Sequence, residues 1–333
     1  MPHRSSPLLG LVLAALASTA LLVPAVPAAL AADAVARQWT QAPGFHRFKL
    51  GTMEVTAIYD GNLRLSTSLL KNITADDLES LLAARFLSSA EGVQTAVNAY
   101  LVNTGDRLVL VDSGAAGLLG PDAGGLVANI RAAGYEPSRI DTVLLTHLHP
   151  DHAGGLLSRD GKAAFPNATV RASQADIDFW LSAEVAAKAP ADAQPFFKMA
   201  RDAVAPYQAA GRFKSFAADE ELLAGIRAVE AGGHTPGHSG FLLTVGDESL
   251  LVWGDIIHSH AVQFARPEVA IEFDIDSNRA VATRKRLLEW TAGKRIWVAG
   301  AHLPFPGIGH VRAEGTGYGW VPLEYAPVAK PGP

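Results

Sequence analysis

Apolar residues occur along this chain in short runs that alternate with segments of helical periodicity. The runs predict strands over 54–59, 96–102, 108–112, 141–145, 169–172, 241–245, 250–252 and 295–299. Between them, the spacing of apolar residues predicts helices over 74–85, 124–133, 174–187 and 278–292. Strands interspersed with helices are typical of sheets covered by helices, so we expect an α/β fold.

The mature chain shows no linker and no internal repeat, and we interpret 33–333 as one domain. Its segment from Asp176 to Gly211 is longer than a connection needs to be and is rich in aromatic residues. Such residues are frequent in pockets and in interfaces alike. Two interpretations therefore stay open for this segment: a lid, or a helical pair that packs on the core or across a dimer interface.

The first 32 residues have the composition of a secretory signal peptide. Arg4 precedes an apolar stretch over 8–23, and alanines close to residue 32 offer cleavage sites. A membrane anchor is the alternative, but Pro24 interrupts the run before it reaches the roughly 20 residues that a membrane span needs. We therefore expect a periplasmic or secreted protein that is not attached to a membrane after cleavage of 1–32.

The net charge of the chain and the absence of several motifs argue against some classes of function. The chain has 28 Lys and Arg residues against 33 Asp and Glu, a formal net charge of −5, so it lacks the basic surface that nucleic acid requires. It has no cysteine and no Gly-x-Ser-x-Gly elbow, which argues against a cysteine or serine nucleophile. The glycine-rich stretch 114–125 lacks the spacing of a nucleotide-binding loop, and we interpret it as a flexible rim of the active site.

The most informative sequence is the run His147-Leu148-His149-Pro150-Asp151-His152, which follows the predicted strand at 141–145. Imidazole nitrogen and carboxylate oxygen suit zinc and similar divalent cations. His147 and His149 can point the same way from an extended segment, which leaves Asp151 and His152 to turn toward a neighbouring ion. Pro150 argues against the interior of a helix. The run is therefore interpreted as half of a two-metal hydrolytic centre on a loop after a strand.

Three more candidate ligands follow downstream. His234 lies in the sequence Gly-His-Thr-Pro-Gly-His-Ser, Asp255 ends the apolar run 250–254, and His302 follows 295–299. Each lies beside an apolar strand-like segment, and such segments can present their loop side chains together at one edge of a sheet. His238 is interpreted as a structural hydrogen-bonding residue rather than a ligand. The alternation of Glu272, Asp274 and Asp276 with apolar residues is interpreted as an extended segment with one solvated face.

This pattern resembles the metallo-β-lactamase superfamily, whose H-x-H-x-D-H motif and later His, Asp and His are all matched. The resemblance implies an αβ/βα sandwich of two mixed β-sheets flanked by helices, with two divalent metal ions, most simply Zn²⁺, at one edge. It also implies that Asp112 supports the metal ligands from behind without binding a metal itself. The implied ligands are His147, His149 and His234 for one metal, Asp151, His152 and His302 for the other, and Asp255 as a bridge.

The chain also resembles the methyl parathion hydrolases and their lactone- and aryl-ester-cleaving relatives. The likeness lies in 100–105, 163–167 and 300–310. The organophosphate-cleaving members carry phenylalanine where this chain has Leu119, and leucines where it has His258 and Phe273. A tetrahedral phosphotriester would be more crowded there than a planar ester, whereas aromatic rings could still stack on the wall. The expected substrate-binding residues are Leu119, Trp180, Phe196, His258, Ile271 and Phe273.

The resemblance implies that a hydroxide held between the two metals attacks the carbonyl of a lactone or aryl ester, with dihydrocoumarin-like lactones as the expected class. Asp151 or Asp255 would relay a proton, and His258 would either donate to the substrate or serve a structural role. The alternatives are an organophosphate triesterase, a diiron redox protein and a periplasmic zinc-binding protein without catalysis. The family resemblance also implies a homodimer.

Overall fold

The structure is a computed structural model that describes residues 35–328. The predicted signal peptide over 1–32 lies outside these residues. Residues 42–328 form one compact unit, and 35–41 belong to a second unit and contain no helix or strand. Within 35–328, none of the helices combines the length and the apolar composition that a membrane span requires.

The first sheet has seven strands, antiparallel from β1 to β5 and parallel from β5 to β8. In spatial order they are β1 (Phe45–Leu50), β2 (Met53–Leu65), β4 (Val93–Asn103), β5 (Leu108–Val111), β6 (Thr142–Leu144), β7 (Thr169–Ser173) and β8 (Phe213–Phe216). The parallel strands β5, β6 and β7 are joined by crossover connections, so the loops after them leave from the same edge.

The second sheet also has seven strands and is antiparallel except for the pair β12 and β14. Its order is β16 (Gly317–Pro322), β15 (Ile308–Glu314), β14 (Trp297–Ala299), β12 (Glu248–Val252), β11 (Ser239–Val245), β10 (Ile226–Glu230) and β9 (Glu221–Leu223). A two-stranded sheet pairs β3 (Leu70–Lys71) with β13 (Ala270–Ile271) beside α1 (Ala75–Ala83). The helix α1 begins at the predicted cap, where Thr74 Oγ1 accepts a hydrogen bond from Asp77 N.

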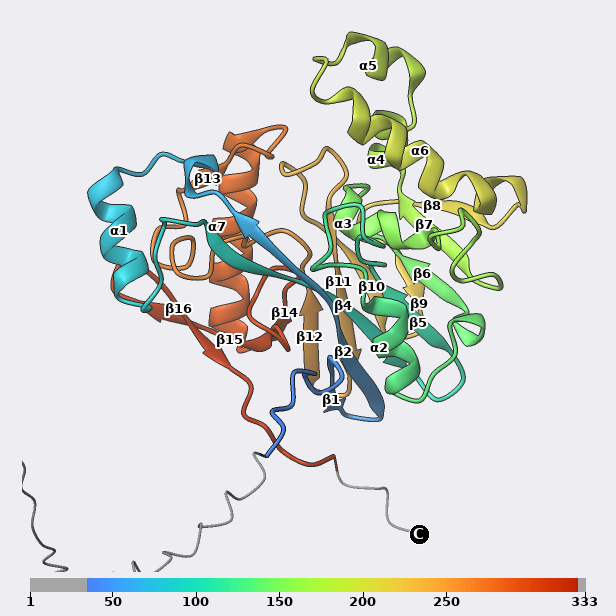
Figure 1. Ribbon diagram of the computed structural model, residues 1–333, viewed down its shortest axis with the longest axis horizontal. Coiled ribbons are helices and arrows are strands. Elements are labelled where there is room, and N and C mark those ends of the chain that lie inside the picture. The colour runs from blue at the N-terminus through green and yellow to red at the C-terminus, as the bar shows by residue number, and fades with distance from the viewer. Residues whose placement is uncertain (1–34, 329–333) are drawn as a thin grey trace, which may run out of the picture. The chain divides into compact units, whose positions relative to one another are not determined.

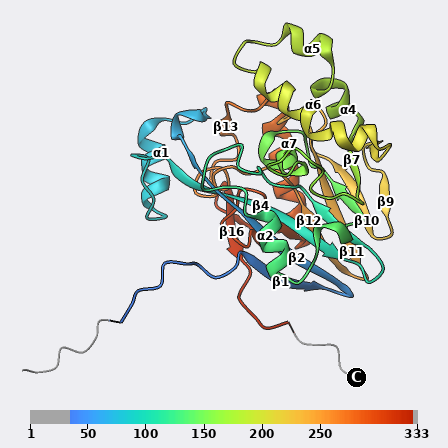
Figure 2. The ribbon, with the colours of Figure 1, turned by 45° about the vertical axis from the view of Figure 1, so that its right-hand side comes forward.

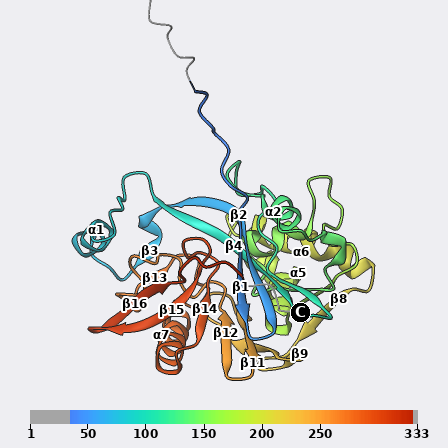
Figure 3. The same cartoon turned by 90° about the horizontal axis from the view of Figure 1, so that it is seen from below.

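Helices cover the outer faces of the two sheets (Figure 3). On the first sheet lie α2 (Leu126–Ala132), α4 (Gln174–Trp180), α5 (Ala183–Lys188) and α6 (Gln194–Ala209), and on the second lies α7 (Ser277–Lys294). Figures 1 and 2 show α4, α5 and α6 grouped together. Short elements complete the fold: α3 (Pro150–Ala153), η1 (Thr67–Leu69), η2 (Pro137–Arg139) and η3 (Gly154–Leu156).

Strand alternation builds the layers of the core. In β5, Val109 and Val111 point into the apolar layer between the sheets, while Leu108 and Leu110 point to the layer under the helices. All four side chains are buried, so β5 reads as a continuous apolar run, as central strands covered on both faces do. The predicted sandwich of two mixed sheets flanked by helices is confirmed.

The segment 176–211 departs from the predicted single helix over 174–187. The first helix, α4, ends at Trp180. Ser182 then caps a new helix, α5, by accepting a hydrogen bond from Val185 N at 3.2 Å. In α6, Phe197, Val204 and Tyr207 are buried in the core layer under the first sheet. The segment therefore forms three helices, α4 to α6, that pack on the core.

Candidate metal centre

All the candidate ligands lie in the segments that follow strands. The run 147–152 follows β6 and includes α3, His234 lies between β10 and β11, and Asp255 and His302 follow β12 and β14. Because β6 belongs to the first sheet and the other strands to the second, the site joins the two halves of the sandwich. The apolar layer between the sheets fixes how far apart these loops lie.

Asp112 anchors the first of these loops. It follows β5 with a positive φ of 61°, and its Oδ1 accepts a hydrogen bond from Thr146 N at 2.8 Å. Its Oδ2 accepts one from His152 Nδ1 at 2.9 Å. Pro150 occupies the first turn of α3, where its missing N–H is no loss. Asp112 thus lies directly behind His152 and supports this candidate ligand by a hydrogen bond, the role that the family resemblance implied.

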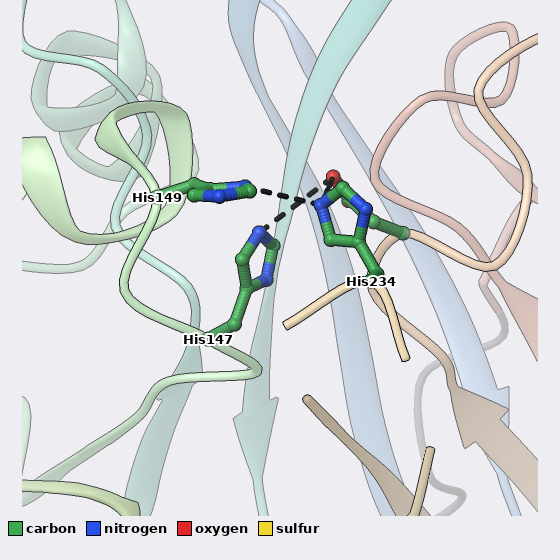
Figure 4. Close-up of side chains that lie close together, drawn as sticks. His147, His149 and His234 are labelled. Atoms are coloured by element: carbon green, nitrogen blue, oxygen red, sulfur yellow. Dashed lines mark hydrogen bonds and ion pairs between the residues drawn. The ribbon is translucent and has the colours of Figure 1, made fainter. Parts of the chain in front are cut away.

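The ligands converge on the carboxylate of Asp255. Its Oδ2 lies within 3.1–3.7 Å of an Nε2 atom of four imidazoles, and its Oδ1 lies 3.1 Å from His152 Nε2. The four imidazoles are those of His147, His234, His258 and His302. His149 Nδ1 lies 3.0 Å from His234 Nε2, and Figure 4 shows the rings of His147, His149 and His234 pointing toward one another.

The side chains fall into the two groups that the sequence implied. Ligand atoms of His147, His149, His234 and Asp255 lie within 4.8 Å of one another. Those of Asp151, His152 and His302 form a second such group, and Asp255, His258 and His302 form a third that overlaps both. The third group was not expected, because His258 was assigned to the substrate rather than to the metal.

The pattern of hydrogen bonds shows that these residues fit metal ions. Three of the imidazoles use Nδ1 to donate to a protein acceptor: His152 to Asp112, His234 to Asp274 and His302 to the carbonyl of Ala96. In the neutral imidazole this leaves each Nε2 with a lone pair directed into the centre, as in metal-ligating histidines. His147 Nε2, His152 Nε2 and Asp255 Oδ1 are also buried without a hydrogen-bonding partner, which is costly unless a cation binds there.

The pKa values show how strongly these groups act on one another. Burial and the neighbouring imidazoles hold the pKa of His147 and His149 well below the usual range. Burial also opposes protonation of His152 and His234, but nearby carboxylates outweigh it; they raise the pKa of His152 well above its usual value and that of His234 to about 9. Burial disfavours the charged form of Asp255, yet the surrounding imidazoles hold its pKa well below its usual range.

Two outer residues lie behind the candidate ligands, one just before β11 and one just after β13. His238 Nδ1 donates to the carbonyl of Ala231 at 2.9 Å and its Nε2 accepts from Asp255 N at 3.0 Å, so it is a structural residue and lies in none of the three ligand groups. Asp274 Oδ1 accepts from His234 Nδ1 at 2.9 Å and its side chain is fully buried. The interpretation of Asp274 as part of a solvated face is therefore wrong.

The reason for this error is a turn. The strand β13 ends at Ile271, and Asp274 N donates back to Ile271 O at 3.0 Å, which ends the two-residue period on which the interpretation depended. Phe273 and Ile275 are consequently exposed by 40% and 50%, and Asp274 turns inward. The flanking acids follow the expectation, because Glu272 and Asp276 are both exposed.

A cavity of about 330 Å³ opens over the ligands and is lined mainly by apolar atoms. Of the expected substrate-binding residues, Leu119, Trp180, Phe196, His258 and Phe273 line it. Ile271 does not. It is fully buried in β13 and packs in the apolar cluster around α1, and the cavity wall is completed instead by Leu63, Leu65 and Ile275. A larger groove of about 550 Å³ lies between the end of α7 and β15 and contains none of the ligands.

Comparison with known families agrees with this geometry. The family model described as metallo-beta-lactamase superfamily matches residues 92–292, which include six of the seven candidate ligands. The chain belongs to the metallo-beta-lactamase superfamily. His302 lies beyond the matched range, and the structure brings it to the centre.

Individual members of the superfamily are similar over different lengths. The crystal structure of the hydrolase AbOPH is 42% identical with a TM-score of 0.83, covering 86% of this chain and all of AbOPH. The dizinc quorum-quenching lactonase AidC, in complex with the product N-hexanoyl-L-homoserine, is 28% identical with a TM-score of 0.79, covering 85% of this chain and 99% of AidC. An N-acyl homoserine lactonase from Bacillus sp is 27% identical over 49% of this chain and 56% of its own length, so the chain spans about half the length of the curated relatives it matches.

Proposed function

We propose that this protein is a metal-dependent hydrolase that opens lactones or aryl esters. The observation that carries the proposal is the convergence of buried imidazoles on Asp255, with their Nε2 atoms directed at its carboxylate beneath an apolar cavity. The similarity to lactonases, one of them described as dizinc, supports the same reaction class.

The donor set suits two zinc ions. His147, His149 and His234 would hold one ion, Asp151, His152 and His302 the other, and Asp255 both. Divalent cations in such a site supply Lewis-acid chemistry: they make water a nucleophile at neutral pH and polarise an ester carbonyl. No serine or cysteine nucleophile is then needed.

The apolar wall of the cavity binds and orients the substrate. Trp180 packs edge-on against His149 with ring centroids 5.1 Å apart, and Phe196 lies 6.4 Å from the same imidazole. An aromatic ring placed between Phe196, Phe273 and the ligands would bury apolar surface and exclude water from the carbonyl. This favours compact aromatic lactones of the dihydrocoumarin kind.

Two side chains are placed to handle protons. Asp151 lines the cavity, and its Oδ2 lies 3.4 Å from His302 Nε2 and 3.6 Å from His152 Nε2. It would accept a proton at this oxygen and pass it to the leaving oxygen of the substrate. Burial lowers the pKa of His258 to about 4, so this imidazole is neutral at pH 7 and would donate an N–H to the substrate.

The pocket also argues against phosphotriesters as the main substrates. Phe273 and His258 stand close to the ligands, and a tetrahedral centre with two alkoxy groups needs more room there than a planar ester. An organophosphate triesterase is the second candidate. The homodimer and export to the periplasm stay predictions.

The test compares dihydrocoumarin, an N-acyl homoserine lactone, a phenyl ester and methyl parathion as substrates of the zinc-loaded protein. We expect dihydrocoumarin to have the highest kcat/KM. Fastest turnover of methyl parathion would overturn the ranking, and no turnover of any of the four by a protein that holds zinc would favour a zinc-binding protein without catalysis. His258→Leu should lower the lactonase rate, whereas His260→Leu, outside the cavity lining, should not.

A further inference from the structure

Asp176 is a buried carboxylate that no step of the proposed reaction uses. It lies in the first turn of α4 and is fully buried. Its Oδ2 accepts a hydrogen bond from Leu148 N at 3.0 Å, and its Oδ1 accepts one from Gly237 N at 2.8 Å. One carboxylate therefore joins two loops that are far apart in the sequence and belong to different sheets.

The two donors lie next to metal ligands. Leu148 stands between His147 and His149, and Gly237 follows His234 by three residues. These three imidazoles make up one ligand group with Asp255. The loops are also joined where they leave their strands, by the hydrogen bond from Ser239 N to Thr146 O at 2.9 Å. Asp176 supplies a second connection, close to the ligands. With one connection the two loops could rotate relative to each other, whereas two connections fix the angle between them.

The packing around Asp176 leaves little freedom. A Cβ atom added to Gly237 would lie 2.0 Å from Ser173 Oγ and 2.4 Å from Asp176 N. Ser173 Oγ in turn accepts a hydrogen bond from Asp176 N at 3.3 Å and so begins α4. The loop that carries His234 therefore lies directly on the junction between β7 and α4. Burial raises the pKa of Asp176 to about 6, against the hydrogen bonds from Gly237 and Leu148.

We propose that Asp176 is a positioning residue that sets the separation between His149 and His234, and through it the affinity of the metal position that these imidazoles share with His147. It belongs to none of the three ligand groups and does not line the cavity. The inference rests on the proposed metal-dependent function. It predicts that loss of Asp176 weakens binding at one metal position and leaves binding at the other unchanged. The group of Asp151, His152 and His302 does not depend on Asp176, because Asp112 holds His152 and the carbonyl of Ala96 holds His302.

The test uses Asp176→Asn, which keeps the volume and one acceptor oxygen but places an NH₂ group opposite the second N–H donor. Zn²⁺ binding to the full chain is measured by competition with a chromophoric chelator. We expect one of the two zinc ions to bind about 10- to 100-fold more weakly and the other to keep its affinity. Asp178→Asn is the matched control, since Asp178 is exposed on the same helix. Two zinc ions bound with wild-type affinity by Asp176→Asn would overturn the proposal.

Two further measurements separate positioning from general destabilisation. Ser173→Ala removes the cap of α4 and leaves both carboxylate bonds in place, so it should lower the unfolding temperature without changing zinc affinity. An equal loss of zinc affinity in Ser173→Ala and Asp176→Asn would contradict the inference.

In the wild-type protein without metal, the amide protons of Leu148 and Gly237 should be protected from hydrogen exchange. Free exchange of both would refute a preformed connection even if Asp176→Asn does not fold. A wild-type chain that binds no zinc would instead defeat the proposed function itself.

Discussion

Asp274 offers a direct test of how the outer residues hold the metal ligands. Its Oδ1 accepts a hydrogen bond from His234 Nδ1 at 2.9 Å, and its Oδ2 accepts one from Ile271 N at 3.1 Å. The guanidinium of Arg284 lies 3.9 Å from the same Oδ2, and both side chains are almost fully buried. Burial lowers the pKa of Arg284 to about 10, so it is charged at neutral pH. Asp274→Ala therefore removes both the acceptor that orients His234 and the counter-charge beside a buried cation.

The size of the effect follows from these contacts. Removing one partner of a buried ion pair costs about 3–5 kcal/mol. Arg284 keeps hydrogen bonds to the carbonyls of Ile256 at 2.7 Å, Val269 at 2.8 Å and Pro267 at 3.1 Å. Because these acceptors remain and the ion pair is long, we expect the lower end, about 3 kcal/mol of unfolding free energy. The loss of the bond to His234 should weaken zinc binding by about 10- to 100-fold.

Urea unfolding of the metal-free protein measures the first quantity, and chelator competition for Zn²⁺ measures the second. The control is Asp276→Ala, two residues further on. Asp276 is exposed and caps α7 by accepting a hydrogen bond from Arg279 N at 3.0 Å. Its replacement should cost about 1 kcal/mol and leave zinc affinity unchanged. The reasoning fails if the two variants lose equal stability and both bind zinc as the wild type does.

Three other predictions concern the metal, the cavity and the core. Chelation of bound zinc should lower the unfolding temperature measured by calorimetry, because the ions bind the folded state; an unchanged temperature would argue against a metal centre. Phe196→Ala should raise KM for an aromatic lactone about 2- to 10-fold with kcat nearly constant in steady-state kinetics, from the loss of one aromatic contact. Leu110→Ala, at a fully buried position, should cost about 2–5 kcal/mol in urea unfolding, whereas Leu118→Ala, 53% exposed, should stay within about 0.5 kcal/mol.

The sequence alone predicted those parts of the site that are marked by residues close together along the chain. The spacing from His147 to His152 and the apolar runs before Asp255 and His302 are local features, and strand edges bring them together. The break between α4 and α5 was not predicted, because Ser182 stands in a window whose overall composition is helical. A local cap sets that boundary, because Ser182 accepts a hydrogen bond from Val185 N and so begins α5.

Two residues behind the ligands, Asp176 and Asp274, could not be found in this way. In the sequence, Asp176 is one acid in the first turn of a predicted helix, where acids are common. Its role depends on backbone N–H groups of two loops from elsewhere in the chain, which no local pattern records. Ile271 was misassigned for a related reason: the turn at 271–274 rotates the following residues toward the cavity and leaves Ile271 in the core.

Asp112, Asp176 and Asp274 share one structural feature with a further residue, Asp60. Four buried carboxylates, those of Asp60, Asp112, Asp176 and Asp274, each accept at least one backbone N–H group, and most of these donors lie in loops. Loops lack the regular hydrogen bonds of a helix or sheet, so their N–H groups need such acceptors when buried. Burial raises the pKa of Asp60 and of Asp176, because their surroundings disfavour a negative charge. Divalent cations at the centre would offset this charge, so the residues that order the loops would also favour binding of the metal ions.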